Sequence, residues 1–224
     1  MTSMKKRLVH LGFVVVALCA LAAAVALAAA DSPAQPNAPA GPAEEALARM
    51  RALTEEGKWQ ELVDRFKNED LSAWPGAGEA FYLRGRAYLL LKDAANAERD
   101  LEAAVEREPK EGYFWHSLGD ACHQLLRDDA RALDAYKKAF ELEDKYGWMP
   151  VDATLKAANI LLYQLKTDAA LEVLHRYGDE DLKRMAPIWR VRILRAYGQV
   201  YAAQGREAEA WAKFREALAV ERGQ

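Results

Sequence analysis

Three polar side chains, His116, Asp120 and His123, have the types and the spacing of a metal site. Their offsets of four and seven residues place all three on one face of a helix. Imidazole nitrogens and carboxylate oxygens both ligate zinc, but a tetrahedral site needs a fourth ligand and supporting hydrogen bonds, and the sequence names no such ligand. We therefore favour the alternative, that these side chains line a groove on the first helix of a helical hairpin.

Signatures of catalysis are missing from the sequence. It has no phosphate-binding glycine loop, no dinucleotide-binding glycine pattern, no HExxH zinc motif and no pair of CxxC motifs. Ser117 follows His116, but neighbouring residues of a helix do not face each other, so we do not expect them to act as a nucleophile and its base. The prediction is a protein that is not an enzyme and needs no cofactor.

The composition is that of a folded, mildly acidic protein. Of its 224 residues, 51% are hydrophobic and 29% are charged, which is enough apolar content for a core. Three of the 31 basic residues lie in the first thirty positions, which hold no acid, so the remainder has 28 basic and 34 acidic residues. A net-acidic body does not attract phosphate backbones, and we expect no nucleic-acid partner.

Residues 1–30 have the three parts of a secretory signal: a basic start, a long apolar stretch and three small residues, Ala28–Ala30, before Asp31. The apolar stretch is also long enough for an uncleaved membrane anchor over residues 8–30. Small residues at the cleavage position favour removal. In either case we expect an exported protein, periplasmic or extracellular, which contacts a membrane only if the segment is uncleaved. Residues 31–42 hold four of the eight prolines and form a Pro/Ala-rich linker.

Residues 43–224 follow a helical pattern throughout, because apolar residues recur at spacings of three and four. A longer period is superimposed on this pattern. Equivalent residues lie 34 apart in two pairs, Phe81 with Trp115 and Gly85 with Gly119. They lie 35 apart in two more, Leu101 with Tyr136 and Ala104 with Ala139. A period of this length indicates stacked helical hairpins that share one core.

The order of residue types within one period resembles the tetratricopeptide repeat family. That family places bulky, small, aromatic, small, bulky, small and proline residues at fixed positions, which are occupied here by Phe81, Gly85, Tyr88, Ala97, Leu101, Ala104 and Pro109. The next unit and the last one, 191–224, also match, whereas 43–76 and 151–184 are degenerate. Over residues 43–224 the resemblance implies an all-α superhelix of about five helix–turn–helix hairpins, with ten helices in five pairs.

Glycines at the small positions of the repeat are expected to let helices approach closely. Glycine inside a helix costs about 1 kcal/mol relative to alanine, so Gly85, Gly119 and Gly198 call for a packing reason. We predict that Gly119 is a contact between two helices.

In the family that this sequence resembles, the first helices line a concave groove that binds other proteins. Carried over by position, the resemblance implies a partner-binding groove lined by Tyr82, Arg86, Tyr113, His116, Asp120, His123, Lys156, Asn159, Tyr163, Arg192, Arg195 and Gln199. The Lys, Asn and Arg set with which one subgroup clamps chaperone C-terminal carboxylates is not matched. Aromatic and arginine side chains are common anchors of interfaces. Our leading hypothesis is a non-enzymatic protein-interaction scaffold of the cell envelope that binds a partner peptide or helix.

Two arginines near one end of this predicted groove, Arg192 and Arg195, lie three residues apart and project on the same side of a helix. The residues four positions earlier are Ile188 and Val191, so no helical salt bridge of the common kind neutralises the arginines. We expect two unpaired cations that recognise a carboxylate or an acidic stretch of the partner.

Self-assembly is the second hypothesis. Trp211, Phe214 and Leu218 lie on the last predicted helix and would pack against a second copy, giving a homodimer, unless they pack within their own hairpin. A metal-binding protein that uses the His116 face is the third hypothesis.

Overall fold

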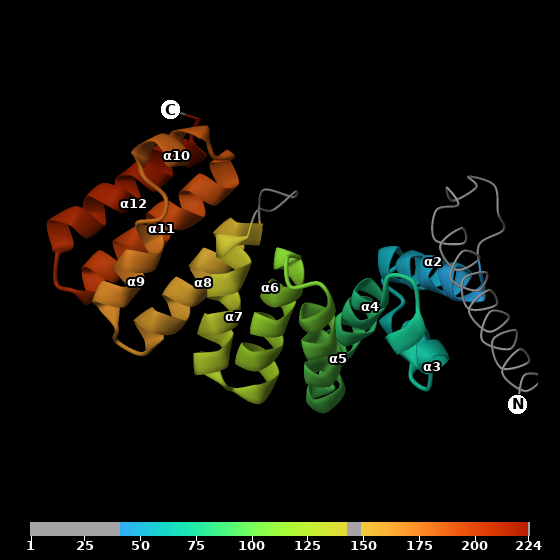
Figure 1. The fold of residues 1–224 in the computed structure, drawn as a ribbon. Coiled ribbons are helices and arrows are strands. Elements are labelled where there is room, and N and C mark those ends of the chain that lie inside the picture. Colours follow the sequence, from blue (N-terminus) through green and yellow to red (C-terminus); the bar gives the residue numbers. More distant parts are fainter. Residues whose placement is uncertain (1–40, 143–148, 224) are drawn as a thin grey trace, which may run out of the picture. The chain divides into compact units, whose positions relative to one another are not determined.

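Five helical hairpins follow one another along the described chain (Figure 1). The computed structural model describes residues 41–142 and 149–223, and its helices all belong to the compact unit Pro42–Gln224. The first helices of the hairpins are α2 (Pro42–Glu55), α4 (Ala77–Leu90), α6 (Gly112–Ala121), α8 (Met149–Tyr163) and α11 (Pro187–Ala203). The second helices are α3 (Trp59–Phe66), α5 (Ala94–Arg107), α7 (Asp129–Glu141), α9 (Thr167–Leu174) and α12 (Glu207–Glu221).

Three shorter elements complete the described chain: the 3-10 turn η1 (Leu71–Ala73), the π-helix η2 (Cys122–Leu126) and the helix α10 (Asp179–Arg184). The predicted all-α fold with five hairpins is confirmed, and both degenerate stretches of the repeat form hairpins, α2–α3 and α8–α9. The predicted count of ten α-helices is one too few for the described residues, because α10 is inserted between the fourth and fifth hairpins.

The N-terminal predictions concern residues that the structure does not describe. The segment 1–30 and the linker up to residue 40 lie outside the described residues. In the part of the chain that the structure describes, no helix has the length and apolar character to cross a bilayer.

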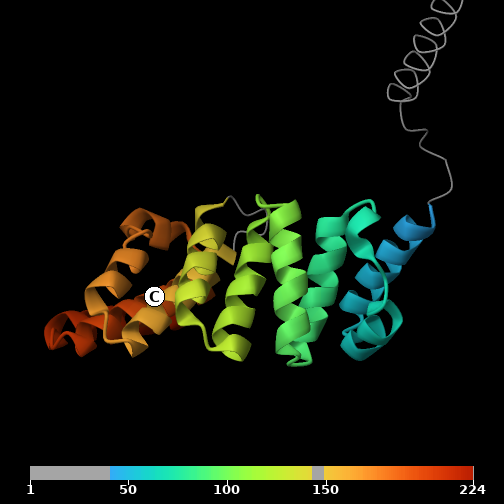
Figure 2. The ribbon, with the colours of Figure 1, turned by 60° about the horizontal axis from the view of Figure 1, so that its bottom comes forward.

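The hairpin turns share one backbone geometry. Each contains a residue in the left-handed region, with φ from 57° to 73°, and these residues are Gly57, Lys92, Arg127, Leu165 and Gly205. Glycine adopts this conformation without steric cost, whereas a residue with a Cβ is strained there. The five turns therefore have the same shape although three of them lack glycine. Figure 2 shows the α4–α5 and α6–α7 turns at the same edge of the stack.

Glycines bring the two helices of a hairpin together. A glycine of the first helix faces a bulky residue of the second in three hairpins, as Gly85 with Leu101, Gly119 with Tyr136 and Gly198 with Phe214. A Cβ built on Gly119 would lie only 2.6 Å from Cε1 of Tyr136. The prediction that Gly119 is a packing contact is confirmed.

The third hairpin accommodates its additional residue in a helix and not in its turn. From the second hairpin to the third, Gly85 and Gly119 are 34 residues apart but Leu101 and Tyr136 are 35 apart, and the structure absorbs the one additional residue in η2, a π-helical stretch that follows α6 directly. The backbone N–H of Asp128 closes this stretch by donating to the carbonyl of Cys122 at 2.9 Å. Side chains after Ala121 are consequently rotated relative to those of α6.

Two clusters of buried apolar side chains meet at α8. Four α8 residues belong to the cluster that extends over α2 to α7, namely Met149, Ala153, Ala157 and Ile160. Four others belong to the cluster that extends over α9 to α12, namely Val151, Leu155, Ala158 and Leu161. The helix α8 thus packs on both sides, and its remaining polar positions carry part of the site described next.

Candidate functional site

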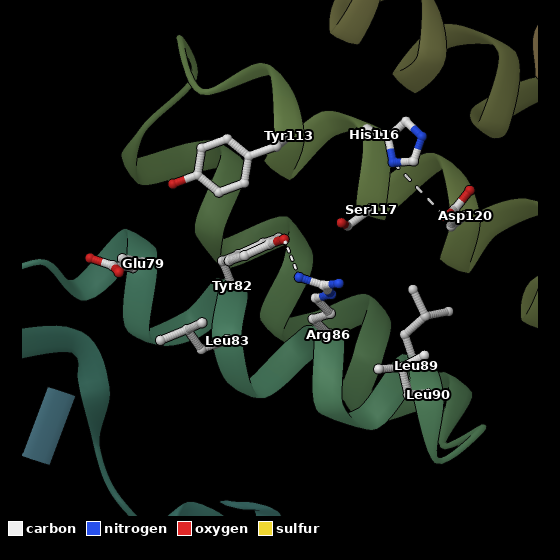
Figure 3. A pocket seen from close by; sticks show the side chains of 10 residues that line it. All are labelled: Glu79, Tyr82, Leu83, Arg86, Leu89, Leu90, Tyr113, His116, Ser117 and Asp120. Atoms are coloured by element: carbon white, nitrogen blue, oxygen red, sulfur yellow. Dashed lines mark hydrogen bonds and ion pairs between the residues drawn. The ribbon is translucent and has the colours of Figure 1, made fainter. Parts of the chain in front are cut away.

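A hollow of about 480 Å³ lies between the first helices of the second and third hairpins (Figure 3). Its α4 side is lined by Glu79, Tyr82, Leu83, Arg86, Leu89 and Leu90. Its α6 side is lined by Tyr113, His116, Ser117 and Asp120. Five of these residues belong to the predicted groove, and Leu83, Leu89 and Leu90 add apolar surface beside Glu79 and Ser117, so the hollow combines apolar walls with a few polar and charged groups.

Aromatic packing fixes the wall of the hollow at its α4 side. The Tyr82 ring is stacked on the ring of Phe114, with a centroid distance of 4.7 Å. The Tyr113 ring packs edge-on against the Tyr82 ring at 4.9 Å. Phe114 is fully buried and so anchors this group in the core. Rigid aromatic surface of this kind favours apolar ligand groups at little cost in side-chain entropy.

Arg86 is the cation of the hollow. Its side chain is exposed, and its Nη1 lies 3.4 Å from the Tyr82 hydroxyl, toward which it points in Figure 3. Its guanidinium lies 5.8 Å from the centroid of Trp59. Among the described residues no carboxylate lies within ion-pair distance of Arg86, and Glu79 is already bonded to Arg51 at 2.7 and 2.5 Å. The positive charge of Arg86 is therefore available to a ligand.

A network of charged side chains continues from the hollow across α8. Asp120 accepts two contacts from Nζ of Lys156, at 2.6 and 2.8 Å, and a hydrogen bond from the hydroxyl of Tyr136 at 2.6 Å. Lys156 also lies 3.2 Å from Asp152. This part of the predicted groove is filled by protein groups that satisfy one another.

Asp152 is the centre of that network. Its carboxylate lies 2.9 Å from Nε2 of His116, and it accepts from Nη2 of Arg192 at 3.0 Å. Burial alone would raise the pKa of the Asp152 carboxyl, but the hydrogen bond from His116 and the charge of Lys156 together outweigh it and hold the pKa well below its usual range. Asp152 is therefore a stably ionised carboxylate that connects α6, α8 and α11.

His116 is held between two carboxylates. Its Nε2 faces Asp152 at 2.9 Å, and its Nδ1 lies 3.9 Å from Asp120. The contact between Nε2 and Asp152 ties α6 to α8.

The structure gathers only part of the predicted groove residues. Five line the hollow: Tyr82, Arg86, Tyr113, His116 and Asp120. Two belong to the ion-pair network, Lys156 and Arg192. Three are exposed outside the hollow: Asn159, Tyr163 and Gln199. The remaining two, His123 and Arg195, have other partners.

Two predictions about these residues are wrong. His123, in the π-helix η2, does not line the hollow with His116 and Asp120; it lies against Asp129, whose Oδ1 is 2.7 Å from its Nδ1. In the described part of the chain no three His, Cys, Asp or Glu side chains are arranged to hold a metal ion.

The second error concerns Arg192 and Arg195, which the sequence predicted to be unpaired cations. Arg192 is paired with Asp152, and Arg195 lies 2.7 Å from Glu221 of α12. Both acids come from neighbouring helices, which a search for local helical pairs does not detect.

Asp152 was missed by the sequence analysis although a signal for it exists. It follows His116 by 36 residues and precedes Lys156 by four, and Lys156 follows Asp120 by the same 36 residues. Two helices one repeat apart therefore present complementary charges at equivalent positions. Comparing charges across the repeat period would have predicted this network.

Comparisons with known proteins agree with this architecture. Residues 78–111 match the model of the tetratricopeptide repeat. No curated protein matches the chain. Solved structures with a similar fold include MamA, at 21% identity and a TM-score of 0.63, with 78% of this chain and 95% of that chain covered. MamA of AMB-1 is 17% identical with a TM-score of 0.62, covering 80% of this chain and 99% of that one. The nearly identical TPR-like repeats of a Podosopora anserina protein described as a kinesin light chain are 17% identical to this chain, with a TM-score of 0.60. The match covers 79% of this chain and 93% of that chain. At these identities the likeness concerns the fold.

Proposed function

We propose that this chain, a tetratricopeptide-repeat protein, is a non-enzymatic scaffold that binds a segment of a partner protein in the hollow between α4 and α6. The observation that carries the proposal is Arg86, an exposed cation without a carboxylate partner among the described residues, placed beside an aromatic wall in a hollow of about 480 Å³. Arginine and tyrosine are the residue types that most often anchor protein interfaces.

The chemistry of the hollow defines the partner segment. Tyr82, Tyr113 and Leu83 offer apolar and aromatic surface, which favours an aliphatic or aromatic side chain of the ligand. The planar guanidinium of Arg86 matches a carboxylate, which it can bind with two parallel hydrogen bonds. We therefore expect an extended or helical segment in which an acidic group lies next to an apolar side chain.

Three alternatives have less support. The remainder of the chain is net acidic, which disfavours nucleic acid as the ligand. Catalysis by His116 is disfavoured because its two ring nitrogens face Asp120 and Asp152. A metal site on the His116 face is disfavoured because His123 lies against Asp129.

The compartment is part of the proposal. Residues 1–30 have the pattern of a secretory signal or membrane anchor, so we propose that the scaffold acts in the cell envelope or outside the cell. Intact-mass analysis of the native protein distinguishes cleavage near Ala30 from a retained anchor. Recovery of the native protein in the cytoplasm would contradict this part of the proposal.

Selection from a random-peptide display library tests the binding claim. Peptides that bind the parent should carry an acidic residue next to an apolar one, and Arg86→Ala should weaken their binding at least about tenfold, because a hydrogen bond to a charged group is lost. Arg195→Ala is the matched control, since Arg195 is also an exposed arginine on a first helix but is paired with Glu221. If both variants bind the peptides as tightly as the parent, the hollow is not the binding site.

A further inference from the structure

The last described helix, α12, has an uncovered apolar face. Trp211 is 65% exposed and Leu218 is 43% exposed, although both are large hydrophobic side chains. Phe214, between them in the sequence, packs instead against Gly198 within the hairpin. Figure 1 shows α12 at the outer end of the hairpin stack.

Equivalent positions in α7 show what this face does elsewhere in the protein. Counting from the shared small and bulky positions of the repeat, Trp211 corresponds to Leu133 and Leu218 to Phe140. Leu133 packs on the core cluster of the following hairpins, and the Phe140 ring lies 5.1 Å from the guanidinium of Arg176, which follows α9. These two positions of α7 thus contact the next hairpin.

Helix α5 uses the same two positions in the same way. Glu98 corresponds to Trp211 and is ion-paired with Arg131 of the next hairpin at 2.5 Å. Val105 corresponds to Leu218 and is buried beside Trp115 of α6. The exposed face of α12 is therefore a hairpin-to-hairpin contact surface that no described residue covers.

Two opposite charges frame this apolar pair. Glu207 lies four residues before Trp211, and Arg222 lies four residues after Leu218, while Trp211 and Leu218 are seven apart. Spacings of four and seven place all four side chains on one stripe of a helix, with the exposed Arg215 at its centre. Glu207 and Arg222 are exposed, and neither takes part in an ion pair among the described residues.

The charged pair and the apolar pair have the same midpoint, between Phe214 and Arg215. A second α12 running antiparallel across that midpoint would bring Trp211 against Leu218 of the second copy. The same placement would bring Glu207 against Arg222 of the second copy, and each contact would occur twice. A surface that is complementary to itself in this way is what a two-fold symmetric interface requires.

We propose that this chain forms a two-fold homodimer through antiparallel packing of α12, with Trp211, Leu218, Glu207 and Arg222 as its contact residues. Glu207 in the first turn of one helix then meets Arg222, the residue that follows the other helix, and the antiparallel helix dipoles also favour this arrangement. This interface is separate from the hollow between α4 and α6, so it stands or falls independently of the binding function proposed above.

Sedimentation of the purified chain over a range of concentrations tests the dimer. We expect the parent to dimerise and Trp211→Glu to raise the dissociation constant at least about thirtyfold, as for a central interface residue. Leu91→Glu is the control, because Leu91 is a 38% exposed apolar side chain in the α4–α5 turn, three hairpins before α12, and should leave dimerisation unchanged. Every variant carries the same residues 1–41, so association through that segment would be common to all. A parent that stays monomeric at its highest soluble concentration would overturn the proposal.

Charge exchange tests the antiparallel geometry. Glu207→Arg and Arg222→Glu should each weaken the dimer, because each places like charges opposite one another twice. The double variant with both changes should recover the parent's dissociation constant within about a factor of three. A double variant that dimerises as weakly as the single variants would overturn the antiparallel pairing. If none of the three variants changes the dissociation constant, the contact lies elsewhere and the proposed interface is wrong.

Discussion

The hollow between α4 and α6 and the groove region around α8 contain the same kinds of charged side chains, but they use them differently. In the α8 region each cation is matched: Lys156 contacts Asp120 and Asp152, and Arg192 contacts Asp152. In the hollow, Arg86 faces a tyrosine hydroxyl and an aromatic ring. Residue type alone therefore does not identify a binding surface. Whether the charge is already neutralised by a neighbouring helix decides between a structural and a binding role.

The largest effect on stability should come from breaking the ion pairs of the α8 region. Asp152→Asn removes the buried carboxylate that His116, Lys156 and Arg192 share; Lys156 keeps Asp120 as a counter-charge, but Arg192 loses its acid and His116 loses the carboxylate at its Nε2. We expect the free energy of unfolding to fall by about 3 kcal/mol, as when one partner of a buried ion pair is removed. Urea denaturation followed by circular dichroism measures it.

The stability difference between the parent and Asp152→Asn should depend on pH. Because the pKa of Asp152 is lowered in the folded state, its contribution is fully present above the usual aspartate pKa of about 3.9 and is lost as the pH falls from there toward the lowered value. The difference in stability between the parent and Asp152→Asn should therefore shrink below about pH 4. A difference that stays constant down to strongly acidic pH would show that ionisation of Asp152 is not its source.

A packing change between the two regions should have a smaller effect. Gly119 lies on α6 next to Asp120, where a Cβ would already approach the Tyr136 ring to 2.6 Å. Gly119→Leu should lower the free energy of unfolding by about 1–3 kcal/mol through overpacking. Thermal unfolding checks this, with Gly41→Leu as the control, since no atom of the described residues lies within 4 Å of a Cβ there. Equal melting of Gly119→Leu and the parent would show that α6 and α7 are not in the described contact.

The smallest effect on stability is expected in the hollow itself. Arg86→Ala removes an exposed side chain without an ion pair among the described residues, so the free energy of unfolding should change by less than about 0.5 kcal/mol. Arg192→Ala, which breaks a partly exposed pair, should cost about 1 kcal/mol. A larger loss for Arg86→Ala than for Arg192→Ala would reverse the comparison between the two regions.

The repeat period could be predicted from the sequence because close packing restricts residue size at a few fixed positions. Gly119 and Tyr136 illustrate this, since the glycine is required by the ring that it faces. The five hairpins and several positions of the hollow follow from that register. The π-helix η2 could not be predicted in this way, because the sequence pattern around the additional residue is the same whether that residue lengthens a turn or a helix.

The pairing of charges was the other feature that local sequence patterns could not provide. Arg192 meets an acid 40 residues away, and Arg195 meets one 26 residues away, both on neighbouring helices. Which acid reaches which cation depends on the packing of those helices. For that reason Arg192 and Arg195 are paired in the structure, whereas Arg86 faces a tyrosine hydroxyl.

The central claim is that Arg86 pairs with a carboxylate of the partner segment, and a double-mutant cycle tests it most directly. A peptide selected on the parent is compared with the same peptide in which its acidic residue is replaced by alanine, each against the parent and Arg86→Ala, by calorimetry. We predict that the two changes are not additive, with a coupling energy of at least about 1 kcal/mol. Additive effects, or a coupling of that size with Arg195→Ala in place of Arg86→Ala, would contradict the account.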